Sequence, residues 1–429
     1  MLKLLLTNHH LTTYGGSELV TLDLAIEFKQ AGWDVTVATF QLSDEIEKNF
    51  KEYDIEVINV LDKSLPQVEF DLVWSHHYPV LIKCLIEDSA KTKSLVMSCL
   101  SPYEPLEAVP FFHVQSDLIL CNSEETKAEI IKDKKCIGFD ENKLFVFKNS
   151  VSSKWFLSTQ IRKDLELKKI AVISNHPPKE ILGVIDILKT KGVEIDLIGI
   201  HGTPKLVDVN LLVSYDAIIT IGRTTQHCMA LNIPVFCYDR FGGPGWLTPD
   251  NFQIAEWFNY SGRCCHQKNS SEQIVSKLIS DFSKAKSFAG FFKTHTINNY
   301  SLQTNIEKVL ALTISGRYLE EYKMFDSEKV VGKVGKAYSN LLIDQEISKG
   351  ELAKSQYQIQ QTQSELAKSQ YQTQQTQSEL AESQYQLEQV RCDLKNYIDI
   401  IKSMEESKFW QLRNIWLQLK KVVKKIWKH

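Results

Sequence analysis

The chain has 429 residues, 43% of them apolar, and a formal net charge of -3 at pH 7. This length allows two domains and an extension. Residues 408–429 carry seven of the basic residues and no acid, so the rest of the chain carries about -10, which argues against a general nucleic-acid binder. Nine cysteines, an odd number without a CxxC pair, argue against a disulfide framework and a zinc site.

The chain begins with the short apolar run 2–6, which polar residues follow at once. That run is too short for a signal peptide, and no stretch approaches the roughly 18 apolar residues of a membrane span. We therefore expect a cytoplasmic protein.

Residues 1–150 alternate apolar runs of strand length with helical patterns, as parallel α/β sheets do. The expected strands are 2–6, 35–40, 55–60, 70–74, 94–98, 118–121 and 144–147. A loop containing Gly15, Gly16 and Ser17 joins the first of them to a helix. Such a loop can hold a negatively charged or hydroxyl-rich ligand, although a plain tight turn is the alternative. The chain contains no dinucleotide fingerprint and no Walker loop.

A second alternating block covers 151–295, with strands expected at 169–173, 195–200, 217–221 and 234–238. The sequence therefore predicts an α/β fold of two Rossmann-like domains, 1–150 and 151–295, with the crossover at Asn149-Ser150-Val151. Ligands are expected in the cleft at the carboxyl ends of the strands.

The densest chemical signal in the second block starts where a strand ends at Gly222. Arg223 follows, and Thr224 and Thr225 begin a helix. Free backbone N–H groups, two hydroxyls and a guanidinium suit a diphosphate. In the alternative interpretation, Thr224 only caps the helix and Arg223 pairs with an acid.

After residue 295 the strands stop, and an all-α extension is expected. It divides into a helical connector at 296–348, a repeat helix at 349–407 and a basic amphipathic helix at 408–429. In the repeat helix a 14-residue unit places apolar residues on one heptad position, while the companion position is mostly Ser or Thr. This pattern fits either a weak coiled coil that forms a homo-oligomer or a solvated spacer.

The last segment, 408–429, carries seven basic residues and no acid beside an apolar stripe with tryptophans. That composition favours binding to an anionic membrane surface, at the inner face of the plasma membrane. Packing against a neighbouring chain is the alternative.

Several of these motifs, taken in order, resemble the GT-B glycosyltransferases of the family 4 type. The resemblance covers residues 1 to about 295 and rests on the glycine loop, the strand ends at 70–76 and 116–123, the crossover and the stretch 222–234. It implies transfer of a sugar from a nucleotide-diphosphate donor on the second domain to an acceptor on the first, with no bound metal and no cofactor. Gly15, Gly16 and Ser17 would then line the acceptor side.

The resemblance also suggests roles for single residues. His76 would contact the reacting sugar or acceptor, and Glu104 or its neighbour Glu107 would bind acceptor hydroxyls or act as base. The donor would contact Gly222, Arg223, Thr224, Thr225, Gln226, His227, Gly242, Gly243 and His176, with Gly242 and Gly243 in a flexible loop. A histidine of the family corresponds here to Cys99. The family's two glutamates, one near the donor sugar and one on the ribose, correspond to Ile219 and His227, so neither carboxylate is present. Gln226 or His227 would instead hydrogen-bond a ribose or base.

The sequence thus predicts a glycosyltransferase acting on a glycan or lipid-linked acceptor at the cytoplasmic membrane face. The missing glutamates leave a second hypothesis open, a scaffold that has kept the fold, oligomerises through 349–407 and binds membrane. A nucleotide-sugar epimerase on the same fold is a third.

Overall fold

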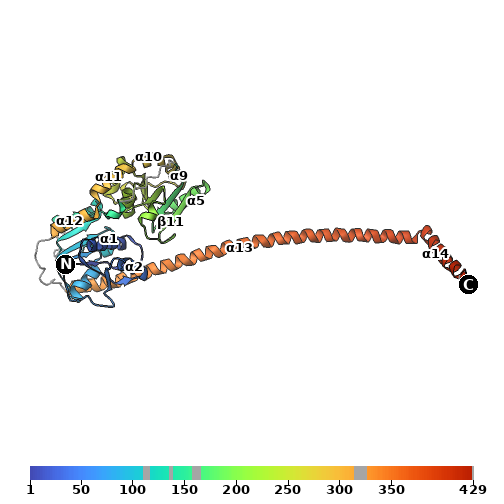
Figure 1. Ribbon diagram of the computed structural model, residues 1–429, viewed down its shortest axis with the longest axis horizontal. Helices are drawn as coiled ribbons and strands as arrows, with labels where there is room; N and C mark the ends of the chain where they lie inside the picture. Colours follow the sequence, from blue (N-terminus) through green and yellow to red (C-terminus); the bar gives the residue numbers. More distant parts are fainter. Residues whose placement is uncertain (110–115, 135–138, 157–165, 314–325, 428–429) are drawn as a thin grey trace. The chain divides into compact units, whose positions relative to one another are not determined.

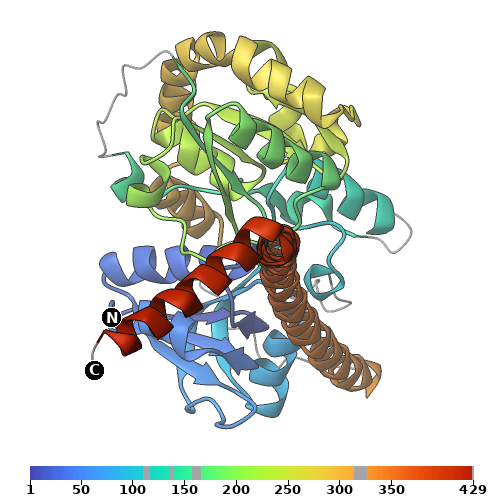
Figure 2. The ribbon, with the colours of Figure 1, turned by 90° about the vertical axis from the view of Figure 1, so that its right-hand side faces the viewer.

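The computed structural model describes residues 1–109, 116–134, 139–156, 166–313 and 326–427. It divides into two compact units, Met1–Ile347 and Ser348–His429. The first unit contains two sheets flanked by helices, and the second consists of helix alone (Figures 1 and 2). The expected α/β class, with two Rossmann-like domains and an all-α extension, is confirmed.

The first sheet has seven parallel strands. In spatial order they are β5 (Glu56–Asn59), β3 (Asp34–Thr39), β1 (Lys3–Thr7), β6 (Glu69–Ser75), β7 (Lys91–Cys99), β8 (Leu118–Cys121) and β9 (Leu144–Val146). A short pair, β2 (His10–Leu11) and β4 (Gln41–Leu42), lies beyond β1 and β3. All strands expected in this domain are present.

Both faces of the first sheet are buried, as its continuous apolar runs require. Leu4 and Leu6 of β1 face a core shared with α1, whereas Leu5 faces the opposite core under α3. The helices of this domain are α1 (Gly16–Gln30), α2 (Asp44–Lys51), α3 (Tyr78–Ile82), which continues as a π-helical turn at Lys83–Glu87, and α4 (Glu124–Lys134).

The second sheet contains β11 (Glu194–Ile198), β10 (Lys169–Ile173), β12 (Ala217–Thr220), β13 (Val235–Asp239) and β14 (Gly242–Trp246), in that spatial order. Its first four strands are parallel and match the expected ones, whereas β14 is antiparallel. The flanking helices are α5 (Lys179–Thr190), α6 (Val209–Leu212), α7 (Arg223–Ala230), α8 (Pro249–Trp257), α9 (Ser271–Ser280), α10 (Phe282–Ser287) and α11 (Ala289–Asn299).

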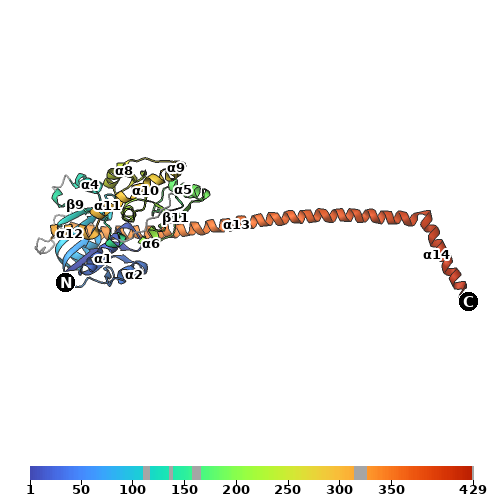
Figure 3. The ribbon, with the colours of Figure 1, turned by 45° about the horizontal axis from the view of Figure 1, so that its top comes forward.

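The chain passes between the domains twice, and the two crossings pair with each other. The Val151 N–H donates to the Tyr300 carbonyl (2.7 Å), and the Leu302 N–H donates to the Val151 carbonyl (3.0 Å). Helix α12 (Leu302–Thr313) then packs on the first domain, where Ile306 joins its core and the Thr313 carbonyl accepts from Ser94 Oγ at 3.0 Å (Figure 3). The boundary expected at 295 thus falls inside α11.

Two helices account for the rest of the described chain. Helix α13 (Asp326–Glu406) continues through Gly332 and Gly335, although glycine is a weak helix former. Helix α14 (Lys408–Ile426) starts after Ser407, whose Oγ accepts from the Trp410 N–H at 3.3 Å. No helix in the described part of the chain has the length and hydropathy needed to span a membrane.

Candidate active site

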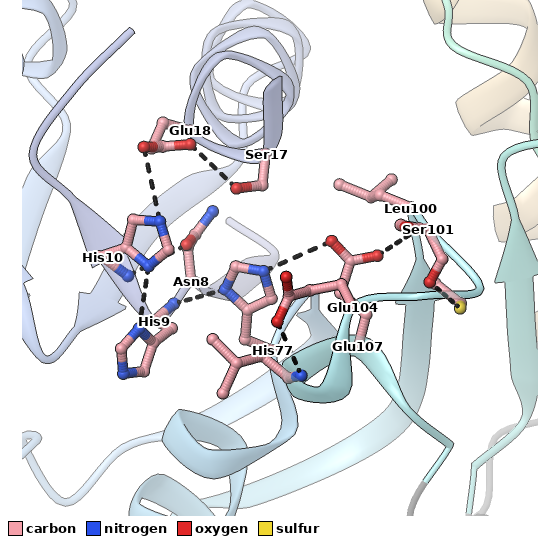
Figure 4. A network of polar contacts seen from close by, with 12 residues as sticks. Asn8, His9, His10, Ser17, Glu18, His77, Leu100, Ser101, Glu104 and Glu107 are labelled. Carbon is pink, nitrogen blue, oxygen red and sulfur yellow. Dashed lines mark hydrogen bonds and ion pairs between the residues drawn. The ribbon is translucent and has the colours of Figure 1, made fainter. Parts of the chain in front are cut away.

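Four histidines follow the two central strands of the first sheet. Strands β1 and β6 pair in parallel and end at Thr7 and Ser75, so the residues after them meet at one sheet edge. There the His9 N–H donates to Nδ1 of His77 (3.0 Å), and Nδ1 of His9 lies 2.9 Å from Nδ1 of His10 (Figure 4). His10 and His77 stack with ring centroids 5.7 Å apart.

A carboxylate contacts each end of this group. Glu18 Oε1 lies 3.7 Å from His10 Nε2, and Glu107 Oε1 lies 3.6 Å from His77 Nε2 (Figure 4). Glu107 also accepts from the Ser101 N–H at 2.5 Å. We refer to His9, His10, His77, Glu18 and Glu107 as the histidine network.

Burial decides the charge of the inner members of the histidine network. It lowers the pKa of His77 well below its ordinary value, an effect that the neighbouring histidines increase, and it raises the pKa of Glu107 well above its ordinary value. The two shifts agree, since both favour an uncharged pair at neutral pH. Burial also lowers the pKa of His9 to about 3. His10, whose side chain is 21% exposed, is the network histidine most open to a ligand.

The glycine loop precedes α1, and Glu18 folds back over it. Thr13 Oγ1 and Ser17 Oγ donate to the Glu18 carboxylate at 2.9 and 3.0 Å. A Cβ atom on Gly15 would lie 2.3 Å from Glu18 Oε2, whereas one on Gly16 would meet no atom within 4 Å. A carboxylate therefore occupies the N-terminus of α1, where a phosphate would otherwise be favoured.

Of the three first-domain residues expected at the chemistry, His76, Glu104 and Glu107, only Glu107 belongs to the histidine network. His76 is 2% exposed and lines a small cavity of about 10 Å³, and its ring nitrogens have no partner among the described residues. Burial lowers its pKa to about 3. Glu104 caps a short 3-10 turn by accepting from the Leu106 N–H at 3.3 Å (Figure 4). The network contains His77 in place of His76, and of the two glutamates it contains Glu107.

The expected diphosphate site lies at the start of α7. Gly222 precedes the helix at φ 58° and ψ -139°, a conformation that favours glycine. The first N–H groups of a helix lack partners within it, so they can receive an anion. Arg223 is ion-paired with Asp23 of α1, so the alternative expected from sequence, a pairing with an acid, is observed. Thr224 is half-buried beside it.

The next three residues of α7 point into the core of the second domain. Thr225, Gln226 and His227 are 0%, 2% and 0% exposed. The Trp155 indole lies flat on the His227 imidazole, with ring centroids 3.9 Å apart. Protein atoms therefore cover both Gln226 and His227, and neither side chain is open to the ribose or base expected there. Ile219, the other position matched to a family glutamate, is buried within the sheet.

The prediction of a flexible loop at Gly242 and Gly243 is wrong. Both glycines are buried in edge strand β14, where a Cβ atom would come within 2.1 Å of the Gln267 carbonyl or the Cys237 carbonyl. Close backbone packing explains these glycines. His176 does lie at the turn between β10 and α5, where it contacts the His201 ring at 6.3 Å between centroids.

A second ion pair joins the two domains. Arg263 donates to both carboxylate oxygens of Glu125, at 2.6 and 2.7 Å. The guanidinium also lies 5.2 Å from the ring centroid of Tyr103 and 5.7 Å from that of Phe241. Together with Asp23 and Arg223, this pair fixes the carboxyl-terminal edge of the first sheet against the second domain.

Part of the histidine network is visible in the sequence, although the sequence alone does not bring its members together. Histidine pairs follow two separate strands, but only the pairing of β1 with β6 shows that they meet. No sequence motif marks Asp23, Glu125 or Arg263 as contact residues, because the partner of each lies more than a hundred residues away in the chain. Among the residues that the structure describes, no group of three His, Cys, Asp or Glu side chains could hold a metal ion.

Two facing Rossmann-like domains, with a final helix that crosses back onto the first, define the GT-B class of fold. Solved structures similar to this chain include a glycosyltransferase from Rickettsia africae ESF-5, with 16% identity, 72% of this chain and 97% of that chain covered, and a TM-score of 0.46. A point mutant of S. aureus TarM, in complex with fondaparinux, alpha-GlcNAc-glycerol and UDP, is 11% identical. The similarity covers 73% of this chain and 99% of that chain, with a TM-score of 0.48. A UDP-N-acetylglucosamine 2-epimerase is 11% identical. The similarity covers 72% of this chain and 94% of that chain, with a TM-score of 0.42.

No protein-family model matches the chain, and no curated protein matches it. The expected assignment to family 4 is therefore not confirmed.

Proposed function

We propose that this protein is a glycosyltransferase that moves a sugar from a nucleoside-diphosphate donor to a hydroxyl of a glycan or lipid-linked acceptor. The observation that carries the proposal is the double role of helix α1. Glu18 in its first turn belongs to the histidine network, and Asp23 contacts Arg223 at the start of α7. Five residues of helix span roughly 7.5 Å, about the length of one sugar ring with its linkage oxygen.

In this proposal the donor diphosphate binds at the N-terminus of α7. The backbone N–H groups of the first turn and the Arg223 guanidinium stabilise the charge that develops on the leaving diphosphate. Arg223 exchanges Asp23 for the diphosphate when the donor binds, since one guanidinium edge serves one bidentate acid at a time.

The acceptor hydroxyl is proposed to approach the histidine network from the side of His10. His10 accepts the hydroxyl proton at a ring nitrogen, and the Glu18 carboxylate, 3.7 Å from His10 Nε2, stabilises the positive charge that forms. The buried His77 and Glu107 stay uncharged. Gly16 leaves open space beside the network and permits close approach of a sugar.

Release of nucleoside diphosphate tests this function. UDP-, GDP- and dTDP-sugars would be assayed with glycan and lipid-linked acceptors, for the wild type, Arg223→Ala and the control Arg240→Ala, which replaces an exposed arginine stacked on Phe241. We expect release with one donor type, a loss of at least tenfold in Arg223→Ala and none in Arg240→Ala. If no donor is bound or consumed, the enzyme proposal is lost.

We propose further that α14 holds the protein at the cytoplasmic membrane face. Its apolar stripe includes Phe409, Trp416 and Ile426, which are 77%, 57% and 68% exposed, and the same helix carries five lysines, one arginine and no acid. Exposed apolar area together with clustered positive charge is the combination that binds anionic lipid headgroups.

A second candidate function, a scaffold without turnover, is favoured by one observation. The position that corresponds to the family's ribose glutamate is a histidine under an indole ring. A scaffold would bind no donor sugar in the assay above, yet would still bind vesicles through α14.

A further inference from the structure

We propose that residues 387–404 of α13 form a parallel, in-register coiled coil with a second copy of this chain. The proposal is independent of whether the protein transfers a sugar. It rests on a difference between two parts of the repeat helix, which are both solvent-exposed in the single chain.

The carboxyl-terminal part of α13 has apolar residues at both seam positions of the heptad. Three successive heptads place them at the first and fourth positions, and all are 55–65% exposed. They are Leu387, Val390, Leu394, Tyr397, Ile401 and Met404. Ile398 and Ile400, 45% and 55% exposed, widen the same face. A sustained pattern of this kind is the signature of a helix that packs its seam against another helix.

The preceding repeats differ at one seam position. Leu352, Ile359, Leu366 and Leu380 continue the first position, which Thr373 interrupts. The fourth position carries only serine and threonine. On average, each of these heptads buries fewer than half as many large side chains, so they extend the pairing without being able to start it. We infer that 387–404 drives association and that 352–386 follows.

The register and orientation of the pair follow from the positions of the serine and threonine residues along the seam. In a parallel, in-register pair every residue faces its own equivalent, so leucine meets leucine and serine or threonine meets serine or threonine. An antiparallel pair of the same length would set Leu387 against Ser369 and Leu394 against Thr362. An antiparallel pair limited to 387–404 would leave the apolar residues from Leu352 to Leu380 exposed.

The positions that flank the seam are compatible with self-association. In a parallel pair the seventh position of one helix faces the fifth position of the partner's next heptad. Glu365 would face Gln370, Glu379 would face Gln384, and Asp393 would face Ile398, so no like charges meet. A second copy therefore meets no electrostatic barrier along this seam.

Parallel pairing has a consequence for α14, which starts at Lys408 directly after the seam. Two copies of α14 emerge from the same end of the coiled coil. When one α14 helix binds a membrane surface, the second is held close to the same surface at high effective concentration. The dimer should therefore bind an anionic membrane more tightly than a single chain.

Sedimentation of the full chain tests the association. We expect a particle of twice the 49.3 kDa chain mass. The variant Leu394→Asp with Ile401→Asp should sediment as a monomer, whereas Gln389→Asp with Asn396→Asp, which adds the same charge away from the seam, should remain dimeric. The substituted side chains are exposed in the single chain, so the sheets fold in both variants. A wild-type mass of one chain, or of three or more, overturns the proposal.

Oxidative crosslinking tests the orientation. In a Cys392→Ser background, Val390→Cys places a thiol in the seam and Glu388→Cys places one outside it. We expect a disulfide-linked dimer from Val390→Cys and none from Glu388→Cys, because only seam positions of a parallel pair bring equivalent Cα atoms within disulfide reach. Equal crosslinking of both variants, or of neither, contradicts parallel pairing.

Discussion

The indole of Trp155 lies parallel to the imidazole of His227, with ring centroids 3.9 Å apart and an interplanar angle of 3°. Trp155 comes from the turn that follows the crossover, and His227 comes from α7. The stack closes the helix face at which the family resemblance puts the ribose. We infer that any nucleotide approaches α7 from its N-terminus.

Replacing Trp155 tests this inference. Trp155→Ala removes a 1% exposed side chain and should lower the free energy of unfolding by about 3–5 kcal/mol. Calorimetric titration with UDP, GDP and dTDP, below the unfolding transition, should show that nucleotide binding survives, since the N-terminus of α7 does not need the indole. Trp155→Phe, which keeps an aromatic ring, serves as the control for stability. Loss of binding in a folded Trp155→Ala protein would place the nucleotide on the stack itself.

Asp23→Asn should strengthen binding of nucleoside diphosphate. The carboxylate pairs with Arg223 in the free protein, and its removal leaves the guanidinium without a competitor for the ligand. A gain of about threefold to tenfold is expected by calorimetric titration. Asp54→Asn, which removes the partner of the surface residue Lys29, is the matched control and should change nothing. Equal affinities for Asp23→Asn and wild type would assign Arg223 a purely structural role.

Buried histidines should make the protein less stable in mild acid. The pKa of His76 is about 3 in the folded state and near 6.5 when unfolded, because burial disfavours the charged ring. Between these values the unfolded chain binds the extra proton, so stability falls as pH falls. The loss is about 1.4 kcal/mol per pH unit for each such histidine, and His9 contributes in the same sense.

Urea unfolding at about pH 7.5 and about pH 5.5 measures this loss. Between these two pH values, the free energy of unfolding of His76→Gln should fall by about 1.4 kcal/mol less than that of the wild type. Substitution of the exposed His201 by Gln is the control. A His76→Gln protein with the wild-type pH dependence would show that His76 is not held neutral.

Gly242 should tolerate no side chain, unlike a glycine that stands in open space. Its φ of 99° is strained for other residues, and a Cβ atom would lie 2.1 Å from the Gln267 carbonyl. Gly242→Ala should cost at least about 2 kcal/mol of unfolding free energy. Gly290→Ala, in helix α11 with no atom within 4 Å, should instead gain up to about 1 kcal/mol. Urea unfolding compares the two, and equal effects would contradict the packing explanation for β14.

Removal of 408–429 should abolish binding to anionic vesicles. Sedimentation with phosphatidylserine-containing and with neutral phosphatidylcholine vesicles, at low and high salt, measures it. The full chain should bind the anionic vesicles and be released by salt, since screening weakens attraction between lysines and headgroups. Equal binding to both vesicle types would rule out an electrostatic anchor.

The sequence by itself determined the strands, the two-domain order and the crossover, because buried parallel strands must be apolar runs wherever they occur. It also located Gly222 and Arg223 at a strand end. It misassigned Gly242 and Gly243, since a glycine needed for flexibility and one needed for close packing look alike in a sequence.

Only the tertiary structure decided which polar residues meet. His77 rather than His76 contacts Glu107, because successive residues after a strand point in different directions and strand pairing determines the neighbours of each. Asp23 meets Arg223 across 200 residues of chain through the docking of two domains, whereas Trp155 covers His227 through packing inside the second domain. Such contacts depend on the packing of whole sheets and helices, which local sequence patterns do not encode.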